Sequence, residues 1–244
     1  MQNCCIIIPC YNESERILAA EFLTFVTENP NFTLLFVNDG STDDTLNLLQ
    51  KLSEQHAQIN LLHLSKNVGK AEAVRTGILD ALKNEHYSYV AFLDADLAIP
   101  LEEFKRLFEL TTANTHLEFT YLSKIRRVDA AVNQTYKRFL MGRILSAMTR
   151  LSLKLPVYDT QCGCKLFSKN IASAVFKLPF ISVWLFDIEI FWRILTLKNR
   201  AYFTTNTLEV PLNKLMDRGS SKVSGKALFK LPFEFLKIHR TYTK

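Results

Sequence analysis

Residues 4–10 of the chain read CCIIIPC, an apolar run with the length of one β-strand. Three similar runs follow within the first hundred residues: FTLLFVN at 32–38, INLLHL at 59–64 and YSYVAFL at 87–93. Between them, residues 14–28, 44–55 and 69–83 carry apolar side chains at helical spacing. Continuous apolar runs are typical of strands buried on both faces, and strands that alternate with helices form mostly parallel sheets. The sequence therefore predicts an α/β fold with flanking helices.

The second half of the chain is less regular. We expect helices at 101–111, 184–198 and 225–242, a long basic helix at 132–153, and strands at 117–122 and within 159–167. The last helix combines a Phe/Leu face with lysines every four residues, and Pro232 is expected to bend or interrupt it. This pattern fits a helix in a membrane interface and, equally, a helix that docks on the protein's own core.

The composition indicates a folded domain without a membrane-spanning segment. Of the 244 residues, 48% are hydrophobic, and the longest stretch without a charged residue is residues 1–12, shorter than the roughly 20 residues that a spanning helix needs. Met1 is not followed by the basic start of a signal peptide. We expect a cytoplasmic protein. Its five cysteines (Cys4, Cys5, Cys10, Cys162, Cys164) contain no CxxC pair, so we expect buried reduced thiols rather than disulfides or a zinc site.

Basic residues are concentrated in two segments. Residues 214–244 contain eight Lys or Arg and two acidic residues, which accounts for the whole net charge of +6, and residues 124–154 contain eight basic residues and one Asp. Such concentration favours a polyanionic partner, either nucleic acid, anionic lipid or a phosphorylated substrate, although a solvated basic face is the simpler alternative. No recognisable nucleic-acid-binding motif accompanies the basic segments, so nucleic acid is not expected as a partner.

Polar residues follow three of the predicted strands where each one ends: PCYNE at 9–13, NDGSTDD at 38–44 and DAD at 94–96. In α/β sheets, ligands bind beyond the carboxyl ends of the strands. Asp94 and Asp96 could bind Mg²⁺ or Mn²⁺ through one carboxylate each and leave positions for substrate phosphates, which would also relieve the repulsion between uncompensated carboxylates. A P-loop and a GxGxxG motif are both absent from the sequence.

These segments together resemble family 2 glycosyltransferases of the GT-A fold, and most closely the polyprenyl-phosphate (dolichyl-phosphate) glucosyltransferases. The similarity is carried by IIIPCYNE at 6–13, VNDGSTDDT at 37–45, NVGKAEAVRTGI at 67–78, FLDADL at 92–97, DTQCGCKLF at 159–167, WLFDIEI at 184–190 and the basic GSSK at 219–222. The resemblance implies a single GT-A catalytic domain, residues 1–212, with a nucleotide-sugar and metal half (1–98) and an acceptor half (99–212). A basic loop and amphipathic segment (213–244) would follow.

The resemblance also implies roles for residues that match the family motifs. A nucleotide sugar, with UDP favoured, would be bound by Pro9, Tyr11, Asn12, Glu13, Asp39, Lys70, Asp94, Ala95 and Asp96, with Asp39 facing the uracil or ribose. Asp94 and Asp96 would hold the metal, and Arg218 and Lys222 would close over the donor diphosphate. Ala98 replaces the Gln that mannosyl-type relatives usually have, which favours the glucosyl branch.

An acceptor phosphate needs cations rather than a catalytic base, because its oxygen is already ionised at pH 7. Arg143 and Lys165 are the preferred pair for this role, Asp159 would orient acceptor-site cations or the donor sugar, and Asp187 and Glu189 would shape the sugar pocket. We therefore expect an inverting enzyme that acts on a polyprenyl phosphate, peripherally on the cytosolic face of an anionic membrane. A homo-oligomer is compatible with this function.

Two alternatives remain. A family 2 enzyme could instead glycosylate a saccharide hydroxyl, with Asp187 or Asp159 as the base. The chain could also be an inactive module that tethers other proteins to a membrane, although intact Asp94 and Asp96 argue against this.

Overall fold

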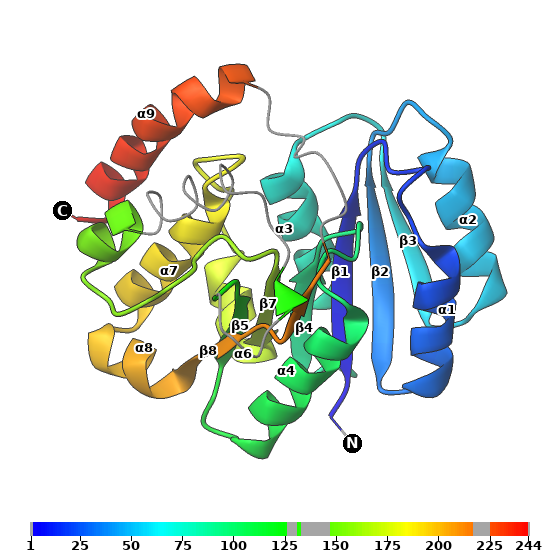
Figure 1. Cartoon of the computed structure of the whole chain (residues 1–244), viewed down its shortest axis with the longest axis horizontal. Coiled ribbons are helices and arrows are strands. Elements are labelled where there is room, and N and C mark those ends of the chain that lie inside the picture. The colour runs from blue at the N-terminus through cyan, green and yellow to red at the C-terminus, as the bar shows by residue number, and fades with distance from the viewer. Residues whose placement is uncertain (1, 126–130, 133–146, 217–224, 244) are drawn as a thin grey trace.

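The computed structural model describes the backbone of residues 2–125, 131–132, 147–216 and 225–243, and the side chains of residues 2–125, 147–216 and 231–243. Its centre is a seven-stranded sheet with the strand order β3-β2-β1-β4-β7-β5-β8 (Figure 1). The strands are β1 (Cys4–Cys10), β2 (Phe32–Asp39), β3 (Ile59–Leu64), β4 (Tyr89–Leu93), β5 (Phe119–Ser123), β7 (Cys164–Ser168) and β8 (Thr207–Pro211). A second, two-stranded sheet pairs β6 (Ala131–Val132) with β9 (Lys214–Leu215).

Strands β3, β2, β1 and β4 are all parallel, as the alternation of strands and helices predicts. Strand β7 is antiparallel to both of its neighbours, β4 and β5, while β5 and β8 are parallel. The sheet is therefore mostly parallel, with one antiparallel strand, β7, between β4 and β5. This strand comes from the DTQCGCKLF segment and runs alongside β4, the strand that precedes the DAD sequence.

Helices cover both faces of the sheet (Figure 1). They are α1 (Ala19–Glu28), α2 (Thr45–Gln55), α3 (Lys70–Ala81), α4 (Leu101–Ala113), α6 (Lys169–Val175), α7 (Phe186–Leu197), α8 (Arg200–Asn206) and α9 (Gly225–Tyr242). Residues 147–153 are also helical. Buried side chains from α1, α2 and α4 pack on one face, and those from α3, α6, α7, α8 and α9 pack on the other.

Strand β1 shows why its sequence is apolar without alternation. Ile6 and Ile8 belong to the core under α1, α2 and α4, whereas Cys5 and Ile7 belong to the core on the other face. Successive side chains of a strand point to opposite faces, so a central strand between two helical layers must be apolar at every position.

The first helix is shorter than predicted. It begins at Ala19 instead of residue 14, because residues 14–16 form a turn in which the Ser14 side chain and backbone both bond to Asp43. Pro232 lies inside a continuous α9, so it does not interrupt the helix, and the alternative expectation that it bends the helix stays a prediction. The predicted helix at 132–153 is confirmed only over 147–153, since Val132 belongs to β6 and residues 133–146 lie outside the described residues.

All five cysteines are buried and free, as expected from their spacing. Burial raises the pKa of the Cys5 thiol to about 12, so this thiol stays protonated and unreactive at neutral pH. Within the described part of the chain, no helix has the length and apolar character that crossing a bilayer requires.

Candidate functional site

The carboxyl ends of β2, β1 and β4 lie side by side, because these three strands are parallel and adjacent in the sheet. The loops that follow them therefore meet at one edge. Asn12, which has a positive φ of 51°, accepts a hydrogen bond from the Thr42 backbone through its side chain (2.8 Å). Its own backbone N–H donates to the Ser41 hydroxyl (3.0 Å). These hydrogen bonds join the loop after β1, which carries Asn12, to the loop after β2.

Asp39, at the end of β2, joins this edge to helix α3. Its two carboxylate oxygens accept the backbone N–H groups of Val68 (2.7 Å) and Gly69 (3.0 Å), and only 3% of the residue is exposed. Burial raises the pKa of Asp39, and the two backbone hydrogen bonds oppose only part of this shift. Asp39 therefore fixes the turn that places Lys70 at the start of α3, and its contact with a nucleotide stays a prediction.

The two aspartates of the DAD sequence both have cationic partners. Lys70 Nζ lies 2.5 Å from Asp94 Oδ1, and Arg16 Nη2 lies 2.7 Å from Asp96 Oδ2. Burial acts to lower the pKa of Lys70, but the neighbouring carboxylates, Asp94 foremost, outweigh burial and the pKa is raised. The sequence-based argument that these carboxylates are uncompensated is therefore wrong: side chains from α3 and from the turn after β1 neutralise them.

Gly163 provides the space that Asp94 occupies. A Cβ atom at residue 163 would lie 2.1 Å from Asp94 Oδ2, and the Asp94 backbone N–H donates to the Gly163 carbonyl (3.2 Å). The DTQCGCKLF segment thus contacts the DAD sequence directly, because β7 pairs with β4. Residue 163 can carry no side chain unless Asp94 moves.

Replacing Gly163 with alanine should displace the Asp94 carboxylate and lower turnover by at least about tenfold, since a misplacement of about 1 Å at a reacting centre can cost a hundredfold. The measurement is kcat with a nucleotide-sugar donor, alongside thermal unfolding. Gly77→Ala is a matched control, because a Cβ there would meet Ile7 and Val37 in the core at 2.7 Å. It should lower stability more than turnover. Wild-type turnover by Gly163→Ala would contradict this account of Asp94.

Asp94 and Asp96 suit a hard divalent cation. Their side chains are 39% and 24% exposed, and oxygen ligands are what Mg²⁺ and Mn²⁺ prefer. No cluster of three or more His, Cys, Asp or Glu that could hold a metal occurs among the residues that the structure describes. One or two protein carboxylates are the usual ligands of Mg²⁺, with substrate phosphates and water in its remaining positions, and Asp94 and Asp96 fit this arrangement.

Lys165 and Asp187 form a buried ion pair behind these aspartates. Lys165 Nζ lies 2.5 Å from Asp187 Oδ1 and 2.8 Å from the Cys162 carbonyl, and Lys165 is 0% exposed. Burial raises the pKa of Asp187, although Lys165 and Lys70 oppose the shift. The ammonium of Lys165 is enclosed and holds the Asp187 carboxylate in place, and its predicted role toward an acceptor phosphate stays a prediction.

Asp159 is held by backbone groups. Its carboxylate accepts the N–H groups of Lys124 (3.0 Å) and Gln161 (2.9 Å). Glu209 of β8, which the sequence analysis missed, accepts the N–H groups of Asp159 (2.8 Å) and Tyr158 (2.9 Å). Burial raises the pKa of Glu209, and these hydrogen bonds oppose the shift. Glu209 is therefore a positioning residue for the turn that carries Asp159.

The other predicted residues divide into three groups. Pro9, Tyr11, Glu13 and Ala95 lie at the same edge, in or directly after β1 and β4. Glu189 is completely buried and bonded to Arg193 and to the Ile181 backbone, so it holds α7 in place, and its part in shaping a sugar pocket stays a prediction. Arg143, Arg218 and Lys222 lie outside the described residues. Arg16 was missed, and the only sequence signal for it was its spacing of three residues from Glu13.

A family model and several known proteins match the chain. The model described as Glycosyl transferase family 2 matches residues 5–176. A dolichyl-phosphate beta-glucosyltransferase of Trichomonas vaginalis is 29% identical over 95% of this chain and 69% of its own length. The enzyme of the same name from Dictyostelium discoideum is 28% identical (95% and 74%), and the human one is 26% identical (95% and 75%).

Solved structures of glucosyl-3-phosphoglycerate synthase from Mycobacterium tuberculosis are also similar. The complex with Mn²⁺, UDP and glucosyl-3-phosphoglycerate gives a TM-score of 0.67 at 15% identity and covers 97% of this chain and 80% of that chain. The complex with phosphoglyceric acid gives 0.70 at 16% identity, with the same coverage. This likeness confirms the predicted GT-A fold.

Proposed function

Because the chain belongs to glycosyl transferase family 2, we propose that it transfers glucose from UDP-glucose to the phosphate of a polyprenyl phosphate at a membrane surface. The curated relatives described above are named dolichyl-phosphate beta-glucosyltransferases, which supports both the sugar and the acceptor. The β-linkage in that name fits inversion of an α-linked donor.

The observation that carries the proposal is the group formed by Asp94, Asp96 and Lys70 at the carboxyl edge of β4 and β1. We place the donor diphosphate here, with the nucleotide over the loops after β1 and β2, next to Asn12 and Asp39. The similar synthase was solved in complex with UDP and Mn²⁺, which supports a UDP-sugar donor and a divalent cation. Asp94 and Asp96 would hold Mg²⁺ or Mn²⁺, which when bound would stabilise charge on the leaving diphosphate as a Lewis acid. Arg218 and Lys222 would add positive charge to the same diphosphate.

A phosphate acceptor agrees better with the site than a sugar hydroxyl does. A hydroxyl needs a base, and the two candidates are already engaged: Asp187 with the Lys165 ammonium, and Asp159 with two backbone N–H groups. A phosphate oxygen is already ionised at pH 7 and needs only to be held by cations. Arg143, from the pair predicted from the sequence, remains our candidate for that contact. Asp187, kept in place by Lys165, would orient the sugar.

Transfer can be tested with radiolabelled UDP-glucose and added polyprenyl phosphate. We expect label to enter the organic phase only when both the lipid and Mg²⁺ or Mn²⁺ are present. Label on an added saccharide that is independent of the lipid would support the hydroxyl-acceptor alternative. No transfer or hydrolysis with UDP-glucose and other nucleotide sugars would support an inactive tethering module.

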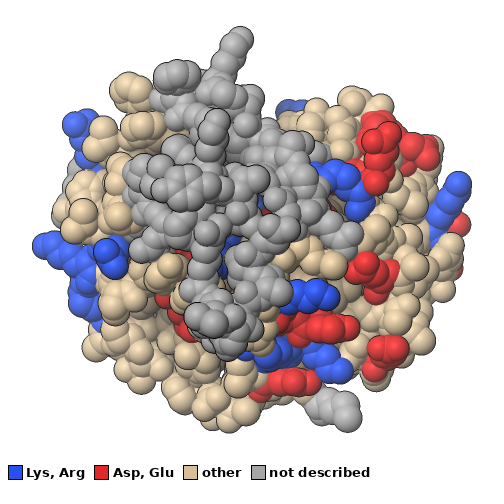
Figure 2. Space-filling model, in the orientation of Figure 1, with Lys and Arg blue, Asp and Glu red and all other residues tan. Residues whose placement is uncertain are grey.

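Helix α9 contributes a surface that suits a membrane. Phe235 and Ile238 are buried against the α7 side of the core, whereas Phe233 and Leu236 are 75% and 47% exposed. In the neighbouring helix 147–153, Leu151 is 76% exposed. Ser152 and His239 hydrogen-bond across the two helices (2.8 Å), so the helices are neighbours, and we propose that the exposed apolar side chains of both face the same membrane. Four exposed basic residues flank these side chains: Arg150, Lys154, Lys237 and Arg240. Figure 2 shows Lys and Arg side chains at the left edge of the molecule, on the side where α9 ends in Figure 1.

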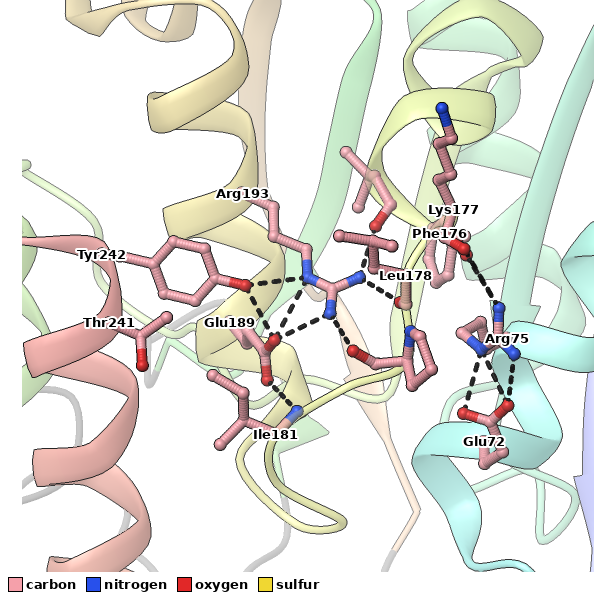
Figure 3. A network of polar contacts seen from close by, with 12 residues as sticks. Glu72, Arg75, Phe176, Lys177, Leu178, Ile181, Glu189, Arg193, Thr241 and Tyr242 are labelled. Carbon is pink, nitrogen blue, oxygen red and sulfur yellow. Dashed lines mark hydrogen bonds and ion pairs between the residues drawn. The ribbon is translucent and has the colours of Figure 1, made fainter.

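Polar contacts hold α9 firmly on the domain. Figure 3 shows the Tyr242 hydroxyl pointing at Glu189 and Arg193 of α7; it lies 2.9 Å from Glu189 Oε1 and 3.2 Å from Arg193 Nε. Near the other end of the described part of α9, Glu234 accepts a hydrogen bond from Ser182. The two sequence-based alternatives for this helix are therefore compatible: one face docks on the core, and we propose that the other contacts lipid.

Replacing Phe233 and Leu236 with serine should weaken binding to anionic vesicles without unfolding the protein, because both side chains are largely exposed. We expect a loss of at least about tenfold in the partition coefficient, measured by vesicle sedimentation at low salt. Leu110→Ser, on α4 and 38% exposed, is the matched control and should bind as wild type does. Binding by the double variant equal to that of wild type would contradict the membrane proposal. Truncation at residue 225 is a poorer test, because it also removes residues of the core.

A further inference from the structure

Arg16 connects two carboxylates at the candidate site through different nitrogens. Its Nη2 lies 2.7 Å from Asp96 Oδ2, and its Nη1 lies 3.2 Å from Glu13 Oε2. The other oxygen of Asp96 accepts the Ala98 backbone N–H (3.1 Å), so both oxygens of Asp96 have partners.

We propose that Arg16 competes with the divalent cation for Asp96 and thereby sets how tightly the site holds that cation. This inference rests on the proposed function, in which Asp96 is a metal ligand. Mg²⁺ binds carboxylate oxygens at about 2.0–2.1 Å, and a guanidinium on the same oxygen is repelled by the ion's charge. Binding of the ion therefore requires Arg16 to withdraw from Asp96 Oδ2, at least in part.

Glu13 makes this withdrawal possible at low cost. Because Arg16 already contacts Glu13 through Nη1, its charge keeps a partner when Nη2 leaves Asp96. The side chains of Arg16, Glu13 and Asp96 are 28%, 12% and 24% exposed, so solvent screens the pairs less than it would at an open surface. Lys70 does not play the same part, because it contacts Asp94 and its charge is stabilised by several carboxylates at once.

The test is a titration with Mn²⁺ in which free Mn²⁺ is followed by its electron paramagnetic resonance signal, with and without UDP. We expect Arg16→Met to bind Mn²⁺ about three to ten times more tightly than wild type. The ion then no longer has to break a partly exposed ion pair or approach a positive charge, and a pair of this kind contributes only modestly. Arg16→Lys, which keeps the charge, should stay nearer to wild type. Lys83→Met is the matched control. Lys83 follows the end of α3 and pairs with Asp80 of that helix, outside the candidate site.

Unchanged or weaker Mn²⁺ binding by Arg16→Met, with a thermal melting curve like that of wild type, would overturn the inference. An equal gain in Lys83→Met would also overturn it, because it would reflect net charge alone. Asp96→Asn in the same titration separates the two proposals. If it loses Mn²⁺ while Arg16→Met behaves as wild type, only the role of Arg16 fails. If it binds Mn²⁺ normally, or if wild type binds none with or without UDP, the metal site fails as well.

Discussion

Asp96→Ala is expected to lower glucosyl transfer by at least about a hundredfold while the protein stays folded. The reason is that the variant loses a carboxylate proposed to hold the cation at the donor diphosphate. The cost in stability should be at most about 1 kcal/mol, because the Asp96 side chain is 24% exposed and its pair with Arg16 is partly solvated. The measurements are kcat in the lipid-phosphate assay and the free energy of unfolding in urea.

Asp80→Ala is the matched control for this variant. Asp80 also pairs with a cation, Lys83 at 2.8 Å, but it lies near the end of α3 and away from the DAD sequence. It should therefore leave turnover unchanged. Near-normal turnover by Asp96→Ala would refute the assignment of this residue to the metal site.

The second large effect is expected from Lys165→Met. Removal of the ammonium leaves the Asp187 carboxylate buried without its 2.5 Å partner, and breaking a buried pair in this way costs about 3–5 kcal/mol. Since burial already raises the pKa of Asp187, the carboxyl of the variant should take up a proton more readily. A protonated carboxyl needs no counter-charge, so the loss of stability should be largest at neutral pH and smaller at acidic pH. Urea unfolding at several pH values measures this.

The double variant Lys165→Met with Asp187→Leu separates stability from catalysis. Because it replaces the pair with apolar side chains of similar size, it should recover most of the lost stability. It should remain inactive if Asp187 orients the sugar. Activity in this double variant would show that the pair serves only to stabilise the fold.

The sequence predicts much of the fold, because β1, β2 and β4 are buried, mainly apolar runs and polar residues stand at or directly after their ends. Residues 4–10 and 59–64 match β1 and β3 in full. The short helices α6 and α8 and strand β8 were missed, since seven or fewer residues contain too little periodicity to identify an element.

The position of the candidate site was predictable, but its bonding was not. Strand ends indicate where Asp94 and Asp96 lie, whereas their partners come from distant segments: Arg16 is 80 residues from Asp96. The burial of Lys165 could also not be predicted, because the sequence of a motif does not show whether its lysine faces solvent or a buried carboxylate. Only the pairing of β7 with β4 turns this side chain inward beside Asp187.

The antiparallel strand β7 also limits how the chain can be divided. It is the second hydrogen-bonding neighbour of β4. Division of the chain near residue 98 would therefore leave the backbone groups on one side of β4, a fully buried strand, without their partners. The two halves that the sequence suggests are thus interlocked. Fragments produced separately would expose the unpaired backbone groups of β4 and β7 and should aggregate. We expect soluble protein only when both fragments are expressed together.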